Sequence, residues 1–351
     1  MPVLRENINE FSFENCRFLK QITIPPSFQK IEKRAFHNCS SLTQIVIPSS
    51  ITDIESDAFN GCESLKKITI PALVKSIGEC AFKDCVSLVS ITILSNLIEF
   101  IKSSTFFNCS SLTEIKIPSS VIAIGKNAFE KCSSLNKILI PSSVVSIKEK
   151  AFNDCFKLKE ITFENPSSLE SIGESAFMNC VSLQNINIPS SVTSIDKAAF
   201  GLCTSLKNVS FQIPSSLTAI ESEVFWKCES LDDFTVPYSV TSINFAAFAD
   251  CSSLKQIYFH SNVYVIERWA FRECKSLTRI KIPPKVQHIN ESTFDCCTSL
   301  NEIIIPPSVI SIEKYAFFNC ISLHKIDMPP SVQFVSKCAF YGSPLQDLYY
   351  E

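Results

Sequence analysis

The sequence predicts a repeat solenoid of mainly β structure with about 15 coils, because three features recur along it. Phenylalanine recurs at Phe13, Phe36, Phe59, Phe82, Phe106, Phe129, Phe152, Phe177, Phe200, Phe225, Phe248, Phe271, Phe294, Phe317 and Phe340. Eleven of the fourteen intervals between these residues are 23 residues long. A cysteine usually follows three residues after the phenylalanine, and a short alternation of isoleucines ends at a proline in almost every copy.

One copy of the repeat illustrates the elements of a coil. In residues 112–117 two isoleucines alternate with charged neighbours, which is the pattern of a short, half-buried strand. Pro118 ends this strand, because proline has no N–H to donate. Val121 and Ile124 turn inward again, and residues 128–135 are predicted to close the coil as a compact helical turn or an irregular arc.

Many copies also place a serine directly before a leucine. This regularity predicts a structural role, in which the hydroxyl bonds the local main chain and caps a turn. These serines include Ser41, Ser64, Ser87, Ser111, Ser134 and Ser182.

A single coil of this length cannot bury its inward side chains alone, so neighbouring coils must stack and pair their strands into a long parallel sheet. We therefore predict one solenoid domain over residues 1–351. Residues 1–24 match the repeat phase and form an N-terminal unit without a separate cap. Residues 329–351 form a degenerate C-terminal capping unit, in which Ser343 replaces the recurrent cysteine.

The recurrent cysteines are predicted to be buried, reduced thiols. Fourteen of the seventeen share one phase of the repeat: Cys16, Cys39, Cys62, Cys85, Cys109, Cys132, Cys155, Cys180, Cys203, Cys228, Cys251, Cys274, Cys297 and Cys320. A cysteine used once per coil acts as a small hydrophobic packing residue. Side chains at equivalent positions of stacked coils point the same way, which disfavours the geometry of a disulfide.

Composition and charge exclude several classes of partner. The formal net charge is −3 and no sustained basic run occurs, so neither nucleic acid nor an anionic membrane surface is an expected partner. No apolar run reaches the length of a membrane span or a signal peptide, which leads to an expectation of a cytosolic protein.

The recurring motif Leu-x-x-Ile-x-Ile-Pro-x-Ser-Val-x-x-Ile-x-x-x-Ala-Phe-x-x-Cys resembles the 23-residue leucine-rich repeat of the BspA-like group, also called the Treponema pallidum type. The resemblance covers residues 2–345. It implies a right-handed, curved solenoid with a parallel sheet on the concave face and short strands, turns or 3-10 turns on the convex side. It also implies a surface-associated, adhesion- or antigen-like protein.

No constellation for catalysis, a cofactor or a metal is recognisable. The four histidines, His37, His260, His288 and His324, occupy different phases of mostly distant coils. Cys-x-x-Cys pairs are absent, and the six glycines form no phosphate-binding loop. The carboxylates are spread one or two per coil, as on a solvated surface. We expect no enzyme activity, no cofactor and no metal.

Specificity is expected in the outward residues of the strands, which vary while the inward residues are fixed. Two outward positions per strand form two rows along the array. The best candidate patch combines Tyr258, Arg279 and Lys281 with Asp233, because Tyr and Arg are frequent binding hot spots. Three asparagines in the same rows complete the candidate partner-binding set: Asn185, Asn187 and Asn208.

Three copies depart from the common length. One extra residue occurs near residues 94–96, and two extra residues follow the strand at each of 164–165 and 212–213. These insertions are either structural slack or partner-contacting loops. The N-terminal coil is expected to expose a strand edge, which predicts weak self-association.

Two functions remain open on the sequence. The first is a non-catalytic protein-binding or adhesion protein that acts through the concave strand face, at a cell surface as the resemblance implies. The second is an intracellular scaffold or regulatory subunit, favoured by the absent signal and the reduced cysteines.

Overall fold

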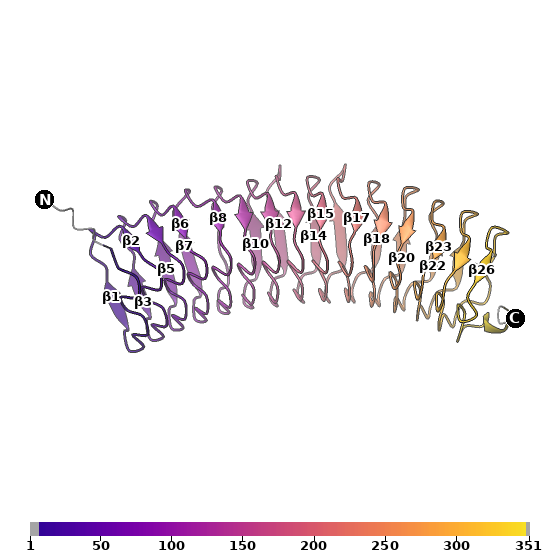
Figure 1. The fold of residues 1–351 in the computed structure, drawn as a ribbon, viewed down its shortest axis with the longest axis horizontal. Helices are drawn as coiled ribbons and strands as arrows, with labels where there is room; N and C mark the ends of the chain where they lie inside the picture. The colour runs from indigo at the N-terminus through magenta and orange to yellow at the C-terminus, as the bar shows by residue number, and fades with distance from the viewer. Residues whose placement is uncertain (1–6, 349–351) are drawn as a thin grey trace. The chain divides into compact units, whose positions relative to one another are not determined.

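The computed structural model describes residues 7–348, which divide into two compact units, Met1–Cys180 and Val181–Glu351. In each unit, successive coils lie side by side, and most contribute a long strand and a two-residue short strand (Figure 1). The prediction of a solenoid of parallel strands is therefore confirmed. The prediction of one domain over residues 1–351, with its terminal units, stays a prediction; residues 1–6 and 349–351 lie outside the described residues.

In the first unit the long strands are β1 (Gln21–Thr23), β3 (Gln44–Val46), β5 (Lys67–Ile70), β7 (Ser90–Ile93), β10 (Lys137–Ile140) and β12 (Glu160–Phe163). The short strands are β2 (Lys30–Ile31), β4 (Asp53–Ile54), β6 (Ser76–Ile77), β8 (Phe100–Ile101), β9 (Ala123–Ile124), β11 (Ser146–Ile147) and β13 (Ser171–Ile172). Parallel pairing joins β1, β3, β5 and β7 in that order, and joins β10 to β12.

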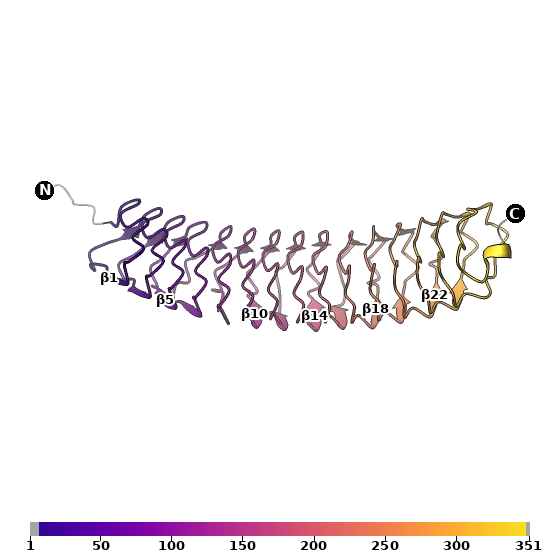
Figure 2. The same cartoon turned by 90° about the horizontal axis from the view of Figure 1, so that it is seen from below.

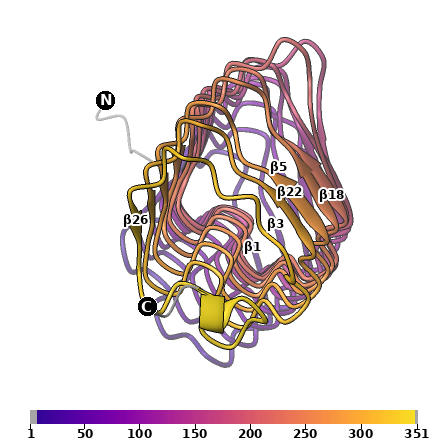
Figure 3. The same cartoon turned by 90° about the vertical axis from the view of Figure 1, so that its right-hand side faces the viewer.

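In the second unit the long strands are β14 (Asn185–Ile188), β16 (Asn208–Phe211), β18 (Asp233–Thr235), β20 (Gln256–Tyr258), β22 (Arg279–Lys281) and β24 (Glu302–Ile304). The short strands are β15 (Ser194–Ile195), β17 (Ala219–Ile220), β19 (Ser242–Ile243), β21 (Val265–Ile266), β23 (His288–Ile289), β25 (Ser311–Ile312) and β26 (Phe334–Val335). The strands β14, β18 and β22 follow one another along one edge of this unit (Figure 2). Seen along the coils, β18 and β22 lie on one side and β26 lies on the opposite side (Figure 3).

The core of each unit is a column of stacked phenylalanines. Ring centroids in consecutive coils are 5.1 Å apart for Phe129 and Phe152 in the first unit and 5.5 Å apart for Phe248 and Phe271 in the second. The recurrent leucine and cysteine are buried beside them, as predicted. Stacked aromatic pairs contribute about 0.5–1.5 kcal/mol each beyond their buried area, so this column stabilises contacts between neighbouring coils.

All seventeen cysteines are free thiols. In both units the thiol of a coil donates a hydrogen bond to the carbonyl of the phenylalanine in the preceding coil, as in Cys62 to Phe36 (3.2 Å) and Cys251 to Phe225 (3.1 Å). We call this series the thiol ladder. Cys16 is the exception, because it lies in the first described coil and is exposed, so the expectation that it is buried was wrong.

The arc that closes each coil is a regular series of tight turns. Alternate N–H groups around each phenylalanine donate to the next coil, as in Phe36 N to Ala58 O (2.8 Å) and Asn38 N to Asn60 O (2.7 Å). Residues two before and two after the phenylalanine have positive φ, for example 55° at Arg34 and 57° at Asn38. The predicted helical turn is not formed there, and within residues 7–348 the only helix is η1 (Gln346–Leu348).

Two local predictions were wrong. Residues 112–117 bury their isoleucines as expected but form no strand, and only a single bridge joins Ser90 to Glu114. The bridge still joins equivalent positions of the two coils, because both residues directly precede the first inward isoleucine. A recurrent hydroxyl bond to the main chain comes from the serine before the inward Val or Ile, as in Ser143 to Val121 O (2.7 Å), and not from the serine before Leu.

Candidate protein-binding face

The long strands of the second unit present two rows of outward side chains. Outward and inward residues alternate along each strand, so Gln256 and Tyr258 point outward while Ile257 is buried between them. The inward isoleucine fixes the strand against the core, and the parallel register then aligns equivalent outward residues of paired strands. We call this surface the strand face.

Asparagines cover the start of the strand face in this unit. The register pairs Asn185 with Asn208 and Asn187 with Ser210. The amide of Asn208 donates to the side-chain oxygen of Asn185 (2.7 Å), and the Ser210 hydroxyl donates to that of Asn187 (3.0 Å). The structure therefore brings the three predicted asparagines together as one exposed polar patch.

The second predicted cluster is divided between the two rows. Asp233 lies opposite Gln256, whereas Tyr258 lies opposite Thr235. Arg279 and Lys281 occupy the two outward positions of β22. Tyr258 is 49% exposed, and its hydroxyl bonds the side chain of Gln256 on its own strand.

Arg279 has a partner that the sequence analysis did not include. Its guanidinium contacts Glu302 on β24 at 3.1 Å, and both side chains are more than half exposed (55% and 51%). An exposed ion pair contributes little to stability, typically about 0–1 kcal/mol. The sequence could have predicted this ion pair, because Arg279 and Glu302 occupy the same outward position in adjacent coils and carry opposite charges.

The electrostatics of the strand face come from exposed groups. Asp232, directly before β18, accepts a hydrogen bond from Lys255 (2.8 Å). That hydrogen bond lowers the pKa of Asp232 and raises the pKa of Lys255. The Lys255 side chain is exposed and the Asp232 side chain is partly exposed, and this pair has no feature of an acid–base catalyst.

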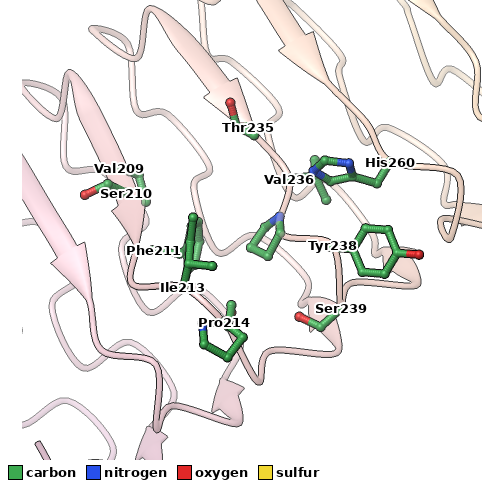
Figure 4. A pocket seen from close by; sticks show the side chains of 12 residues that line it. Val209, Ser210, Phe211, Ile213, Pro214, Thr235, Val236, Tyr238, Ser239 and His260 are labelled. Atoms are coloured by element: carbon green, nitrogen blue, oxygen red, sulfur yellow. The ribbon is translucent and has the colours of Figure 1, made fainter.

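Two pockets lie where the long strands of the second unit end, and the sequence analysis did not predict them. The first has a volume of about 550 Å³. Phe211 and Ile213 lie on one side of it, and Tyr238 and His260 lie on the other (Figure 4). The insertion at 212–213 was the only sequence signal for this pocket.

The second pocket also has a volume of about 550 Å³. His260 lines both pockets, so they adjoin and form what we call the strand-end groove. Tyr258 and Lys281 of the predicted cluster line the second pocket, together with Pro283 and Ile304.

Within residues 7–348, no group of three or more His, Cys, Asp or Glu residues is placed to hold a metal ion. In that range no helix has both the length and the apolarity needed to cross a bilayer.

A parallel solenoid with leucine at a fixed inward position is the architecture of leucine-rich repeat proteins. The family model described as BspA type Leucine rich repeat region (6 copies) matches residues 6–136, 122–255 and 218–346. The chain therefore belongs to the BspA-type leucine-rich repeat family.

Solved structures agree with this assignment. A leucine-rich repeat protein from Bacteroides ovatus is 30% identical, with a TM-score of 0.81 over 93% of this chain and 86% of that chain. Another from Eubacterium ventriosum is 24% identical, with a TM-score of 0.58 over 93% and 91%, and shows the same fold. No curated protein matches the sequence. Proteins of this family are in general non-catalytic and act in protein–protein interaction or adhesion.

Proposed function

We propose that this chain is a non-catalytic binding protein that engages a protein partner through the strand face of its second unit. The observation that carries the proposal is the contrast within the strands. Ile257, Ile280 and Ile303 are buried at one equivalent position, whereas the outward residues beside them differ in size and charge from coil to coil. A fixed scaffold with a variable surface is suited to recognition.

The residues proposed to contact the partner are Asp233, Tyr258, Arg279, Lys281, Asn185, Asn187 and Asn208. Tyr258 supplies a rigid, half-exposed aromatic ring, and Arg279 and Lys281 supply cationic donors beside it. Aromatic and arginine side chains dominate binding energy in many interfaces, so these residues are the expected hot spots.

The experiment compares two matched double variants in partner capture by cross-linking and affinity purification. Tyr258→Ala/Arg279→Ala removes the strand-face pair. Tyr264→Ala/Arg268→Ala is the control, because Tyr264 is similarly exposed (53%) and neither residue belongs to a long strand. We expect the first variant to lose the partner and keep its thermal stability, and the control to keep both. Equal capture by both variants would refute the proposal.

The setting of this activity has two candidates. An adhesion role at a cell surface agrees with the general activity of the family. A role as an intracellular scaffold or regulatory subunit agrees with the free thiols of the core. Labelling of intact cells with a membrane-impermeant reagent distinguishes them, because only the surface protein is modified.

A further inference from the structure

The strand-end groove has two apolar pockets in register with the coils. The first is lined by Phe211, Ile213 and Tyr238, and the second by Pro283 and Ile304. Each pocket involves residues from three successive coils, and the coil of His260 is shared. The pockets are therefore centred about two coils apart. Stacked phenylalanines in these coils are 5.5 Å apart, which places the centres roughly 11 Å apart.

The two long insertions provide an internal comparison, because they are held in the same way. Glu164 N bonds Ile140 O at 3.0 Å, and Gln212 N bonds Ile188 O at 2.9 Å. The Glu164 carboxylate accepts a bond from Ser142 N (3.0 Å), and the Gln212 side chain accepts one from Ser190 N (3.4 Å).

The residue that follows differs between the two insertions. The first has the polar Asn165, whereas the second has Ile213, which is 93% exposed. The same hydrogen bonds hold both insertions, so the loop at Ile213 does not need an apolar side chain at that position to keep its conformation. Burial of an isoleucine by a partner contributes about 1.5–3 kcal/mol, so Ile213 is suited to binding.

The charge of the groove selects the chemistry of the occupant. No carboxylate lines either pocket, and Lys281 is the charged side chain among the lining residues. Lys285 lies beside the groove and contacts Asn262, whose amide in turn bonds the Tyr238 carbonyl (3.1 Å). A carboxylate on the occupant would complement these lysines, whereas a cationic segment would be repelled.

We propose that the strand-end groove binds an extended segment of the partner protein that carries two apolar anchors and flanking acidic residues. A polyproline II segment rises about 3.1 Å per residue with three residues per turn, so side chains three apart lie roughly 9 Å apart on one face. This spacing is close to that of the pockets. Exposed aromatic rings such as Tyr238 are typical of surfaces that bind such segments. The inference deepens the proposed binding role and rests on it.

The test selects random dodecapeptides displayed on phage against the full chain. We expect enrichment of sequences with two apolar residues three apart and flanking Asp or Glu. Enriched peptides, made synthetically, should bind Ile213→Asn about tenfold more weakly, since that loss corresponds to about 1.4 kcal/mol. Lys281→Glu should weaken them similarly, and binding to the wild-type chain should fall with added salt.

The controls use the internal comparison. Ile213→Asn installs the residue of the first insertion, so the variant is expected to fold, and Asn165→Ala should bind the peptides like the wild type. Absence of enrichment, enrichment of basic sequences, or unchanged affinity of Ile213→Asn would overturn the proposal. If the partner is lost with Tyr258→Ala/Arg279→Ala but kept by Ile213→Asn, the groove proposal fails and the proposed function stands.

Discussion

The thiol of Cys132 donates a hydrogen bond to the main-chain carbonyl of Phe106, 3.2 Å away in the preceding coil. Both residues are fully buried. The bond joins consecutive coils through a side chain, and equivalent bonds recur in both units. The recurrent cysteine is therefore a donor between coils as well as a packing residue.

Truncation of one thiol in the ladder should destabilise the array locally. Cys132→Ala removes the donor and leaves a small cavity, so unfolding free energy should fall by about 1–2 kcal/mol in chemical denaturation. Cys132→Ser retains a donor and should cost less. Cys16→Ala, at the exposed first position, is the control. A serine variant no more stable than the alanine variant would show that the hydrogen bond is unimportant.

Alkaline pH should destabilise the protein through the same thiols. Burial raises the pKa of Cys132 and Cys251 above the ordinary value of 9.0. Above pH 9 the unfolded chain therefore releases these protons while the folded chain retains them, so stability falls as pH rises. Each thiol contributes a slope of about 1.4 kcal/mol per pH unit. Denaturation of Cys132→Ala/Cys251→Ala between pH 9 and 11 should give a shallower slope than the wild type; parallel slopes would contradict this.

Cys296 should react slowly with iodoacetamide despite its partial exposure. Burial, reinforced by Asp295, raises the pKa of its thiol to about 11. At pH 8 only about one molecule in a thousand is then a thiolate, and the rate should rise about tenfold per pH unit up to pH 10. Asp295→Asn should accelerate labelling at pH 8. Mass spectrometry measures the rate, and a profile that is flat with pH would disprove the assignment.

A side chain at Gly61 should destabilise the arc. Its φ is +74°, and a Cβ there would lie 2.3 Å from the side-chain oxygen of Asn38 in the preceding coil. Gly61→Ala should lower the unfolding free energy by at least about 1–2 kcal/mol, the cost of a left-handed conformation for an L-residue. Gly201→Ala is the control, because its Cβ would meet its nearest neighbour at 3.4 Å, an ordinary contact. Equal melting temperatures would exclude this steric account.

Self-association through the first described coil is a further proposal. Phe18 is 94% exposed and Phe11 is 44% exposed, which leaves apolar surface beside β1. We expect a weak, concentration-dependent dimer in analytical ultracentrifugation, and Phe18→Ser should weaken it. A monomer at the highest soluble concentration would end this hypothesis.

The sequence predicted the inward positions well, because Phe, Leu, Ile and Cys recur where the core needs them. The sequence predicted less well the structural features that depend on contacts with neighbouring coils. At residues 112–117, a single bridge at Glu114 stands where the alternating pattern predicted a strand. The positive φ in the arc could have been predicted from residue types in the sequence. Asn, Asp or Gly often occurs two residues after the phenylalanine, as at Asn38 and Gly61.

The candidate site was predicted in part. Alternation in the strands placed the outward asparagines and Tyr258 correctly on one surface. The pairing of Arg279 with Glu302 and the groove beside Ile213 depend on side-chain directions and on the path of an insertion. A repeat pattern does not contain that information, because it describes what the coils share.

The interior coils of each unit repeat the same pattern of bonds: arc N–H groups donate to the following coil, and thiols donate to the preceding one. Any two interior coils therefore present matching surfaces to each other. Loss or duplication of a whole copy, such as the one between Phe106 and Phe129, would rejoin compatible partners, whereas loss of part of a copy would move the inward residues out of phase. The number of coils can thus change during evolution, or be changed by engineering, without redesign of the core.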